Sequence, residues 1–273
     1  VIDKERNLGF GGKCVEAVPH IREEIEYRFE RAANLNKSEI SIIEIGGTVG
    51  DYQNIMFIEA ARVLKIKHPE NVVFIMVRYL PIPSKIGEMK SRPTQNAVHQ
   101  LSSYGVSTDF IIGRADMPID KKRKEKIGIA CNIPEENVIS APDIDSVYDV
   151  PINFEKDKMG EQLIKALKLK SRKGSGLGEW SKFAHAVKNT EKEVNIAIVG
   201  KYFNTGDFIL SDSYISVLEA IKYSAYAQKV KPKIHAVNAN DFEVKNSDYK
   251  TLDKFDGIIV PGGFGEKGIE GKV

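Results

Sequence analysis

Hydrophobic and polar positions along the chain follow two alternating patterns. Runs rich in β-branched residues predict buried strands at 40–45, 71–79, 109–114 and 137–140. Between them, apolar residues recur at helical spacing and predict helices at 20–33, 54–66, 93–102, 121–130 and 159–167. Strands that alternate with helices in this way are typical of an α/β fold with a parallel sheet.

The pattern changes between residues 170 and 192. This segment contains the run Lys-Ser-Arg-Lys-Gly-Ser-Gly-Leu-Gly, and such small and charged residues are typical of a linker. Trp180 and Phe183 within it are expected to anchor it to a neighbouring element. A second α/β pattern follows, with strands predicted at 194–199, 233–237 and 257–260 and a helix at 214–228. We therefore expect two domains, 1–169 and 193–273, joined by a linker at 170–192.

Composition excludes several classes of protein. The chain has 273 residues, enough for two domains with cores of their own, and its net charge of +2 argues against nucleic acid as a partner. The basic run at 121–124 fits a solvated helix face. Two cysteines, Cys14 and Cys131, exclude a disulfide framework, and both are expected to be buried or half-buried thiols. The chain has no membrane-length apolar run and no signal peptide, so we expect a cytoplasmic protein and no membrane partner.

The first candidate site is the glycine-rich turn after the strand predicted at 40–45. Glu44 lies within that apolar strand, where an unpaired carboxylate is costly to bury. It therefore needs a cation, which is either Mg²⁺ beside nucleotide phosphates or a Lys or Arg side chain. The turn at 46–51 reads Gly-Gly-Thr-Val-Gly-Asp. Its glycines let a ligand approach the backbone, although a structural role in the turn also explains them.

The second candidate site is the segment 87–95, which reads Gly-Glu-Met-Lys-Ser-Arg-Pro-Thr-Gln. Two cations, two hydroxyls and an amide lead directly into a predicted helix, whose first N–H groups are free to bind an anion. This combination suits a triphosphate. A generic basic loop accounts for Lys90 and Arg92 but not for Thr94 and Gln95.

The third candidate site is the sequence Pro-Gly-Gly-Phe-Gly at 261–265. Backbone N–H groups at a strand end can form an oxyanion hole, worth about 3 kcal/mol per donor in the transition state. A Gly-Gly turn alone is weak evidence, and no cysteine nucleophile lies in this half of the chain. Arg114 and Lys126 flank a predicted strand–helix unit and could reach a shared ligand. The histidines have no metal-ligand spacing, and none is assigned a catalytic role.

Taken together, these segments resemble the CTP synthase family. The matching strings lie in the family's order over nearly the whole chain, at residues 1–6, 18–21, 44–51, 87–95, 132–134, 199–202, 212–220 and 260–265. The resemblance implies a P-loop-like parallel-sheet amidoligase domain, followed by part of a class I glutamine amidotransferase α/β domain. It also implies that ATP phosphorylates O4 of UTP and that ammonia released from glutamine displaces this phosphate to give CTP. Mg²⁺ would accompany ATP, GTP would activate, CTP would inhibit, and the assembly would be a homotetramer, with filaments as a further form.

The resemblance also assigns roles by position. Glu44 matches a Mg²⁺ ligand near the ATP phosphates. The UTP and CTP site is matched by Asp51, Tyr52, Gln53, Lys90, Ser91, Arg92, Pro93, Thr94, Gln95 and Lys126. ATP contacts are matched by Arg114, Pro142, Asp143 and Ile144. The glutamine site is matched by Gly263 and Phe264, with Gly262 and Gly263 near the oxyanion, and the GTP-linked lid is matched by Lys201, Lys267, Gly268 and Glu270.

The sequence also departs from the family's pattern. It lacks the glycine-rich phosphate loop with its lysine and the amidotransferase Cys, His and Glu, so we expect this chain to be a catalytically incomplete piece. Gln53 stands where the family usually has an acid, and Lys267 replaces a usual arginine and its bidentate fork.

Two alternatives remain open. The first is a non-catalytic, nucleotide-binding or filament-forming relative of the same family. The second is another phosphate-loop ligase, such as a relative of cobyrinic-acid amidase or dethiobiotin synthetase, which should lack the Gly-Glu-Met-Lys…Pro-Thr-Gln string.

Overall fold

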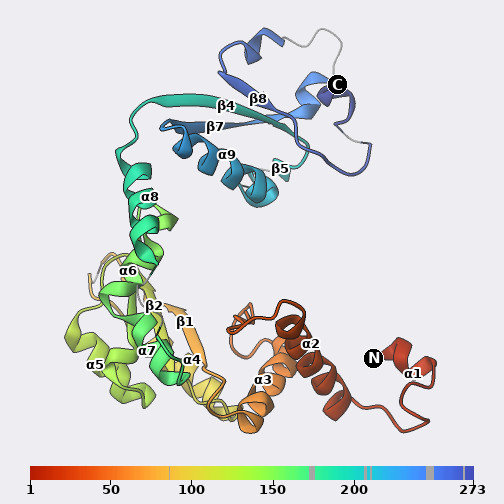
Figure 1. Cartoon of the computed structure of the whole chain (residues 1–273), viewed down its shortest axis with the longest axis vertical. Helices are drawn as coiled ribbons and strands as arrows, with labels where there is room; N and C mark the ends of the chain where they lie inside the picture. The colour runs from red at the N-terminus through yellow and green to blue at the C-terminus, as the bar shows by residue number, and fades with distance from the viewer. Residues whose placement is uncertain (86, 172–175, 206–207, 210, 244–248, 267) are drawn as a thin grey trace. The chain divides into compact units, whose positions relative to one another are not determined.

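The computed structural model describes residues 1–273 except 86, 172–175, 206, 207, 210, 244–248 and 267, and at 204, 205, 208, 209, 211 and 212 it describes the backbone alone. The chain divides into two compact units, Val1–Ser175 and Gly176–Val273 (Figure 1). The division falls within the segment predicted to be a linker. Each unit is described by itself below.

The first unit is built around a three-stranded parallel sheet with strand order β1-β2-β3. Its strands are β1 (Ile75–Tyr79), β2 (Phe110–Ala115) and β3 (Val138–Pro142). Its helices are α1 (Ile2–Arg6), α2 (Arg22–Leu35), α3 (Ile55–Lys67), α4 (Arg92–Ser103), α5 (Lys121–Cys131), α6 (Val150–Lys156) and α7 (Met159–Ala166). The predicted α/β architecture with a parallel sheet is confirmed.

Helices cover both faces of this sheet, which explains why its strands read as continuous apolar runs. On one face, Met76, Ile111 and Val138 pack against residues of α4 and α5. On the other face, Ile112 and Ile139 pack against residues of α6 and α7. Because β2 lies in the centre, it is buried along nearly its whole length. The carboxyl ends of the three strands are left to face the loops that carry the candidate site.

The core position in α5 provides a matched test of this packing. Ile127 is fully buried, whereas Ile129 on the same helix is 77% exposed. Replacing Ile127 by alanine should lower the free energy of unfolding by about 2–5 kcal/mol, because it removes buried methyl groups and leaves a cavity. The Ile129→Ala control should change it by less than about 0.5 kcal/mol. Denaturant unfolding followed by circular dichroism measures both, and equal effects would contradict the packing.

The prediction of a strand at 40–45 is wrong. These residues have no regular secondary structure, and Ile42 is 95% exposed. A strand needs a neighbour for its backbone hydrogen bonds, and no described strand pairs with this run. Glu44 is exposed to water as well. The argument that burial forces it to bind a cation therefore fails.

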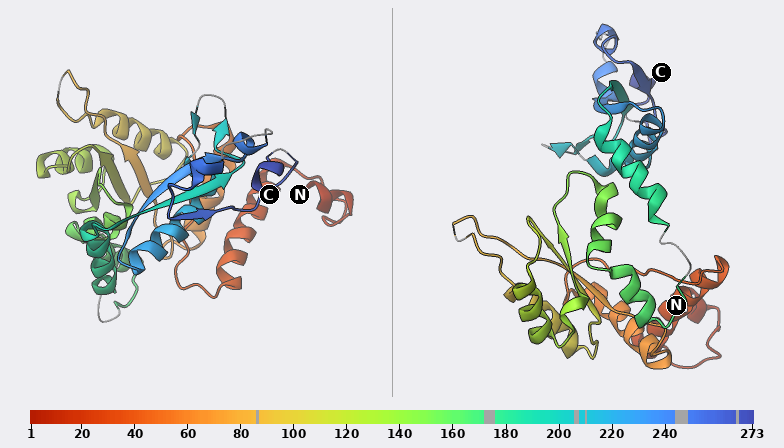
Figure 2. Two further views of the ribbon diagram at one scale, coloured as in Figure 1. Left: turned by 90° about the horizontal axis from the view of Figure 1, so that it is seen from above. Right: turned by 60° about the vertical axis from the view of Figure 1, so that its left-hand side comes forward.

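The second unit contains a parallel sheet with strand order β7-β4-β8 and a short antiparallel pair, β5-β6. Its strands are β4 (Glu193–Gly200), β5 (Asn204–Thr205), β6 (Phe208–Ile209), β7 (Lys231–Asn238) and β8 (Gly257–Ile259). Its helices are α8 (Leu177–Asn189) and α9 (Ile215–Ala227). Helix α9 lies along β4 and β7 in the different views (Figures 1 and 2).

The predicted linker contains more structure than its composition indicated. Residues 177–189 form helix α8. The ring of Phe183 stacks on Tyr223 of α9, with centroids 5.2 Å apart, and Trp180 lies 5.8 Å from Phe183. The expectation that Phe183 anchors this segment to a neighbouring element is confirmed. Aromatic packing of this kind supplies buried area that a flexible linker lacks.

The remaining general predictions concern cysteines and membranes. Cys131 is buried, and its burial raises the pKa of the thiol to about 11. Cys14 is exposed, so the expectation that both thiols are buried or half-buried is wrong for this one. Of the helices in the described ranges, none is long and apolar enough to cross a membrane.

Candidate nucleotide and glutamine sites

The loop between β1 and α4 brings the second candidate site to the carboxyl edge of the first sheet. The backbone N–H of Leu80 donates to the carbonyl of Arg114 at 2.7 Å, and that of Lys90 donates to Pro81 at 2.9 Å. Met89 is buried in the core beneath this loop. The start of the loop is therefore tied to the sheet and its end is bonded back to its start, so residues 90–95 lie near the edge where parallel sheets bind ligands.

The first turn of α4 has unsatisfied hydrogen-bonding groups. Ser91 precedes the helix, yet its side chain makes no capping hydrogen bond, and its hydroxyl instead accepts from the amide of Gln95 at 3.2 Å. Thr94 is fully buried, and its hydroxyl oxygen has no hydrogen-bond partner. Free N–H groups at the start of a helix favour an anion through the helix dipole. Thr94 supplies a further unused hydroxyl in that same turn.

Cations from two elements gather around this turn. Lys90 donates to the carboxylate of Glu88 at 2.5 Å. This hydrogen bond lowers the pKa of Glu88 below its ordinary value, and the positive charges of Lys90, Arg123 and Lys126 lower it further. Lys126 of α5, which the resemblance assigns to the same ligand as Lys90, is thus one of the charges that act on Glu88. Arg123 was missed, because within a basic run nothing distinguishes it from a solvated lysine.

The predicted ATP residues also meet at the carboxyl edge. Arg114 of β2 is paired with Ala141 of β3, and the N–H of Asp143 donates to the carbonyl of Ala115 at 2.8 Å. Arg114 and Asp143 are exposed, as is Ile144, while Pro142 is partly buried. Exposed side chains at adjacent strand ends can share one ligand.

Sequence reasoning missed two neighbours of Arg114. The hydroxyl of Tyr79 donates to Asp116 at 2.6 Å, and this hydrogen bond, together with the charges of Asp116 and Asp143, raises the pKa of Tyr79. Only their positions in the sequence could have indicated these two residues, because Tyr79 ends β1 and Asp116 directly follows β2. Their side chains extend the polar cluster across the ends of two strands.

A Mg²⁺ site requires several oxygen ligands close together. Glu44 is exposed, and nowhere in the described ranges do three or more His, Cys, Asp or Glu side chains form a group able to hold a metal ion. Mg²⁺ in proteins requires close to octahedral oxygen coordination. These residues do not supply it by themselves, so no chemical step is derived through a metal.

The two parts of the predicted pyrimidine site lie at different positions along α4. Asp51 accepts a hydrogen bond from the N–H of Thr48 at 2.8 Å, and Tyr52 begins a short 3₁₀ turn with Gln53 next to it. The adjacent Gly50 lies against Gln100, so close that a Cβ atom there would be 2.2 Å from the amide nitrogen. Eight residues of helix separate Gln100 from Arg92, a rise of about 12 Å.

In the second unit, the predicted glutamine residues follow β8. This strand lies on one side of β4, and β7 lies on the other. After β4, the chain first adds β7 on one side of β4 and then β8 on the other. Open parallel sheets bind ligands at the point where successive strands change sides in this way. Gly262 and Gly263 are exposed, and the side chain of Phe264 is 92% exposed. Lys201, directly after β4, donates to the carbonyl of Phe264 at 3.0 Å.

The predicted lid residues lie next to Lys201. Gly268 has φ +77°, and its N–H donates to Glu243 at 2.6 Å. A Cβ atom on Gly268 would be 3.2 Å from Cγ of Lys201, so these two residues are in contact distance. Glu270 is exposed at the start of a 3₁₀ turn. Lys267 lies outside the described residues.

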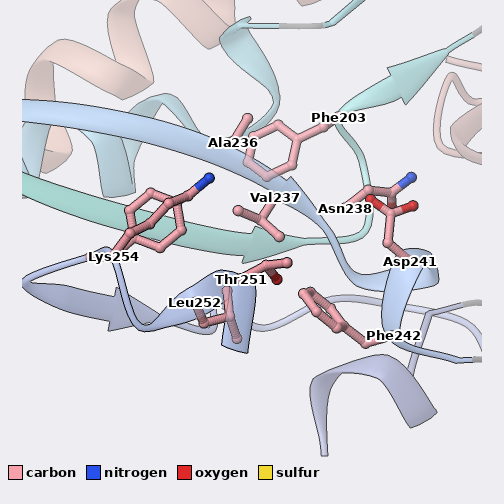
Figure 3. A pocket seen from close by; sticks show the side chains of 10 residues that line it. Phe203, Ala236, Val237, Asn238, Asp241, Phe242, Thr251, Leu252 and Lys254 are labelled. Atoms are coloured by element: carbon pink, nitrogen blue, oxygen red, sulfur yellow. The ribbon is translucent and has the colours of Figure 1, made fainter. Parts of the chain in front are cut away.

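The second unit also contains a cavity of about 460 Å³ (Figure 3). Lys254 lies at one end of it, and Asn238 and Asp241 lie at the other, with Phe203 and Phe242 among its walls. It is lined by none of the residues assigned above from the sequence. We therefore assign it no part in the candidate sites.

Comparison with known proteins gives a consistent match. The family model described as the CTP synthase N-terminus matches residues 1–169. CTP synthases from Thermococcus gammatolerans, Pyrococcus abyssi and Caldanaerobacter subterraneus are 43%, 42% and 42% identical to this chain. Each alignment covers 100% of this chain and 49–50% of the relative. The chain thus spans about half the length of the curated relatives that it matches.

Proposed function

Because this chain belongs to the CTP synthase family, we propose that its protein converts UTP to CTP, using ATP and ammonia released from glutamine. It is thus a ligase of pyrimidine nucleotide synthesis, and we place it in the cytoplasm, where these substrates occur. The observation that supports this proposal best is the cation cluster at the first turn of α4. There, Lys90 pairs with Glu88, Arg92 is exposed at the helix start, and the buried hydroxyl of Thr94 has no partner.

This cluster suits a pyrimidine triphosphate for electrostatic reasons. Charge-assisted hydrogen bonds from Lys and Arg to phosphate are shorter and stronger than neutral ones, and the helix dipole adds to them. Lys90 pairs with Glu88 at 2.5 Å. A triphosphate would replace this single carboxylate as the partner of Lys90. Arg92, exposed at the helix start, would provide a second contact.

The cluster around Arg114 is the proposed ATP site, with Pro142, Asp143 and Ile144 on its rim. In the proposed reaction, the γ-phosphoryl group of ATP is transferred to O4 of UTP, which turns that oxygen into a leaving group. Ammonia attacks C4, phosphate departs with the electron pair of the C–O bond, and the added nitrogen loses a proton. Mg²⁺ would accompany ATP as part of the substrate.

We propose that residues 51–53 and 90–95 act in different copies of the chain. Within one chain they are associated with different ends of α4, as the contact between Gly50 and Gln100 indicates. A homotetramer, in which one subunit supplies Lys90–Gln95 to a neighbour, would complete the pocket. Feedback inhibition by CTP would use Asp51 and Tyr52 with Gln53. Filaments would be a further assembly of such tetramers.

The second unit is the proposed beginning of a class I glutamine amidotransferase domain, with residues 193–273 in it and 170–192 as the connection from the amidoligase domain. Gly262 and Gly263 would stabilise the oxyanion, and Phe264 would contact glutamine. Lys201, Lys267, Gly268 and Glu270 would respond to GTP. The contacts of Lys201 with Phe264 and Gly268 support a common site for these residues.

The test is CTP formation by the full-length protein, measured by chromatography of the nucleotides. With UTP and ATP present, we expect CTP from either glutamine or ammonium chloride, and no CTP when ATP is omitted. A protein that binds CTP but forms none under any condition would instead be the non-catalytic relative. That result would contradict the proposal.

A further inference from the structure

The turn at 261–265 is held by three side chains from outside it. Lys201 donates to the carbonyls of Phe264 and Gly265. The hydroxyl of Tyr202 accepts a hydrogen bond from the N–H of Phe264 at 2.5 Å and donates to the carbonyl of the same residue at 3.2 Å. Lys272 donates to the carbonyl of Pro261 at 2.5 Å.

These contacts fix the direction of individual peptide groups. In a planar trans peptide, the C=O and the next N–H point in opposite directions. Because Lys272 holds the carbonyl of Pro261, the N–H of Gly262 points away from Lys272. Because Tyr202 accepts from the N–H of Phe264, the preceding carbonyl of Gly263 points away from that hydroxyl. The peptides on both sides of the glycine pair are therefore oriented by side chains.

The space beside Gly263 is occupied by the same three side chains. A Cβ atom there would lie 2.9 Å from Cδ of Lys201, 3.2 Å from the hydroxyl of Tyr202 and 3.4 Å from Nζ of Lys272. All three side chains thus converge on one backbone position.

The three side chains are themselves supported. The N–H of Lys201 donates to the hydroxyl of Tyr214 at 2.9 Å, and the rings of Tyr202 and Tyr214 stack with centroids 5.6 Å apart. Tyr214 is buried in the core between α9 and the sheet. Partial burial, together with the nearby charge of Lys201, lowers the pKa of Lys272. This indicates that the two ammonium groups lie close together beside the turn.

We propose that Lys201, Tyr202 and Lys272 are positioning residues for glutamine hydrolysis. They orient the Pro261–Gly262 peptide so that the N–H of Gly262 faces the oxyanion that develops on the glutamine carbonyl oxygen, and they hold the Gly263–Phe264 peptide that follows it. This inference rests on the proposed function, since it requires that the protein use glutamine. It gives Lys201 a role in the turn itself, apart from any response to GTP.

The experiment compares two nitrogen sources in the full-length protein without GTP. Tyr202→Phe keeps the stacked ring and removes the hydroxyl, and Lys201→Met keeps the chain length and removes the charge. We expect each to lower kcat/KM for glutamine by about 10- to 100-fold, a typical cost of misplacing oxyanion donors. CTP formation from ammonium chloride should stay within about twofold of the unmodified protein, since ammonia bypasses the turn.

Lys222→Met is the matched control, because Lys222 pairs with Glu219 on α9. It should leave both rates unchanged. A Tyr202→Phe or Lys201→Met protein with normal glutamine use would overturn the inference, as would equal losses with glutamine and ammonia. In a second series with GTP added, a variant that loses only the stimulation by GTP, with normal glutamine use in its absence, would also overturn it. If the unmodified protein forms no CTP from ammonia, the proposed function fails first, and this inference fails with it.

Discussion

Replacing Lys90 and Arg92 together by methionine is expected to raise the KM for UTP by about 100- to 10,000-fold, since each lost charge-assisted hydrogen bond costs about 1.5–3 kcal/mol. Arg92 is the first residue of α4, and Lys90 directly precedes Ser91, which provides no capping bond. Methionine keeps most of the length and removes only the charge and the donors. Steady-state kinetics with UTP varied at saturating ATP measures the change.

A rise in the KM for UTP without a rise in the KM for ATP would show that these residues bind the UTP triphosphate. A general loss of positive charge would raise both KM values. The KM for ATP should stay within about threefold, because ATP is assigned to a separate cluster. Lys122→Met is the matched control, since Lys122 is exposed in the same basic region of α5. We expect it to change neither KM. An unchanged KM for UTP in the double variant would refute the assignment of the segment at 90–95.

The second large effect is expected at Arg114. Arg114→Met should raise the KM for ATP by about 10- to 100-fold, because it removes the cation among Tyr79, Asp116 and Asp143. The two carboxylates would then repel the nucleotide without compensation. The KM for UTP should change little. Kinetics with ATP varied at saturating UTP provides the measurement.

Arg28→Met on α2 is the control for this variant. Its side chain is 72% exposed and pairs with Glu24, far along the chain from the strand ends. The KM values of this variant for ATP and for UTP should equal those of the unmodified protein. If Arg114→Met alters the KM for UTP instead of that for ATP, the two nucleotide sites have been assigned the wrong way round.

Strands with a described partner were predicted well from the sequence. The runs that became β1, β2, β3, β4, β7 and β8 are short, apolar and β-branched, and each pairs with at least one parallel neighbour. The run at 40–45 has the same composition, yet Ile42 is 95% exposed and no strand forms. Pairing depends on a neighbouring backbone, which a local pattern does not specify.

Helix α8 was not predicted, because the contacts that stabilise it involve residues far away in the sequence. The glycines and charged residues before it predict a linker, but the structured part is stabilised by contacts of Phe183 with Tyr223 and Tyr226, 40 and 43 positions away in the chain. Helices of this length depend mainly on tertiary packing. Local composition therefore underestimated the order of this segment.

For the candidate sites, the sequence indicated which segments of the chain are involved. It did not indicate most of the contacts between their side chains. Lys90 and Lys126 were both predicted, and they approach the same carboxylate. Tyr79 and Asp116 were missed, because their hydrogen bond joins two strand ends that are 37 positions apart. The prediction that Glu44 is buried was wrong, because it depended on a strand that does not form.

The central claim is that the first turn of α4, with Lys90, Arg92 and Lys126, binds a pyrimidine triphosphate. The most direct measurement is an experimental structure of the full-length protein with CTP or UTP bound. We predict the triphosphate at residues 90–95, with Lys90 and Arg92 within hydrogen-bond distance of its oxygens. A nucleotide bound elsewhere, with Lys90 still paired to Glu88, would contradict the account.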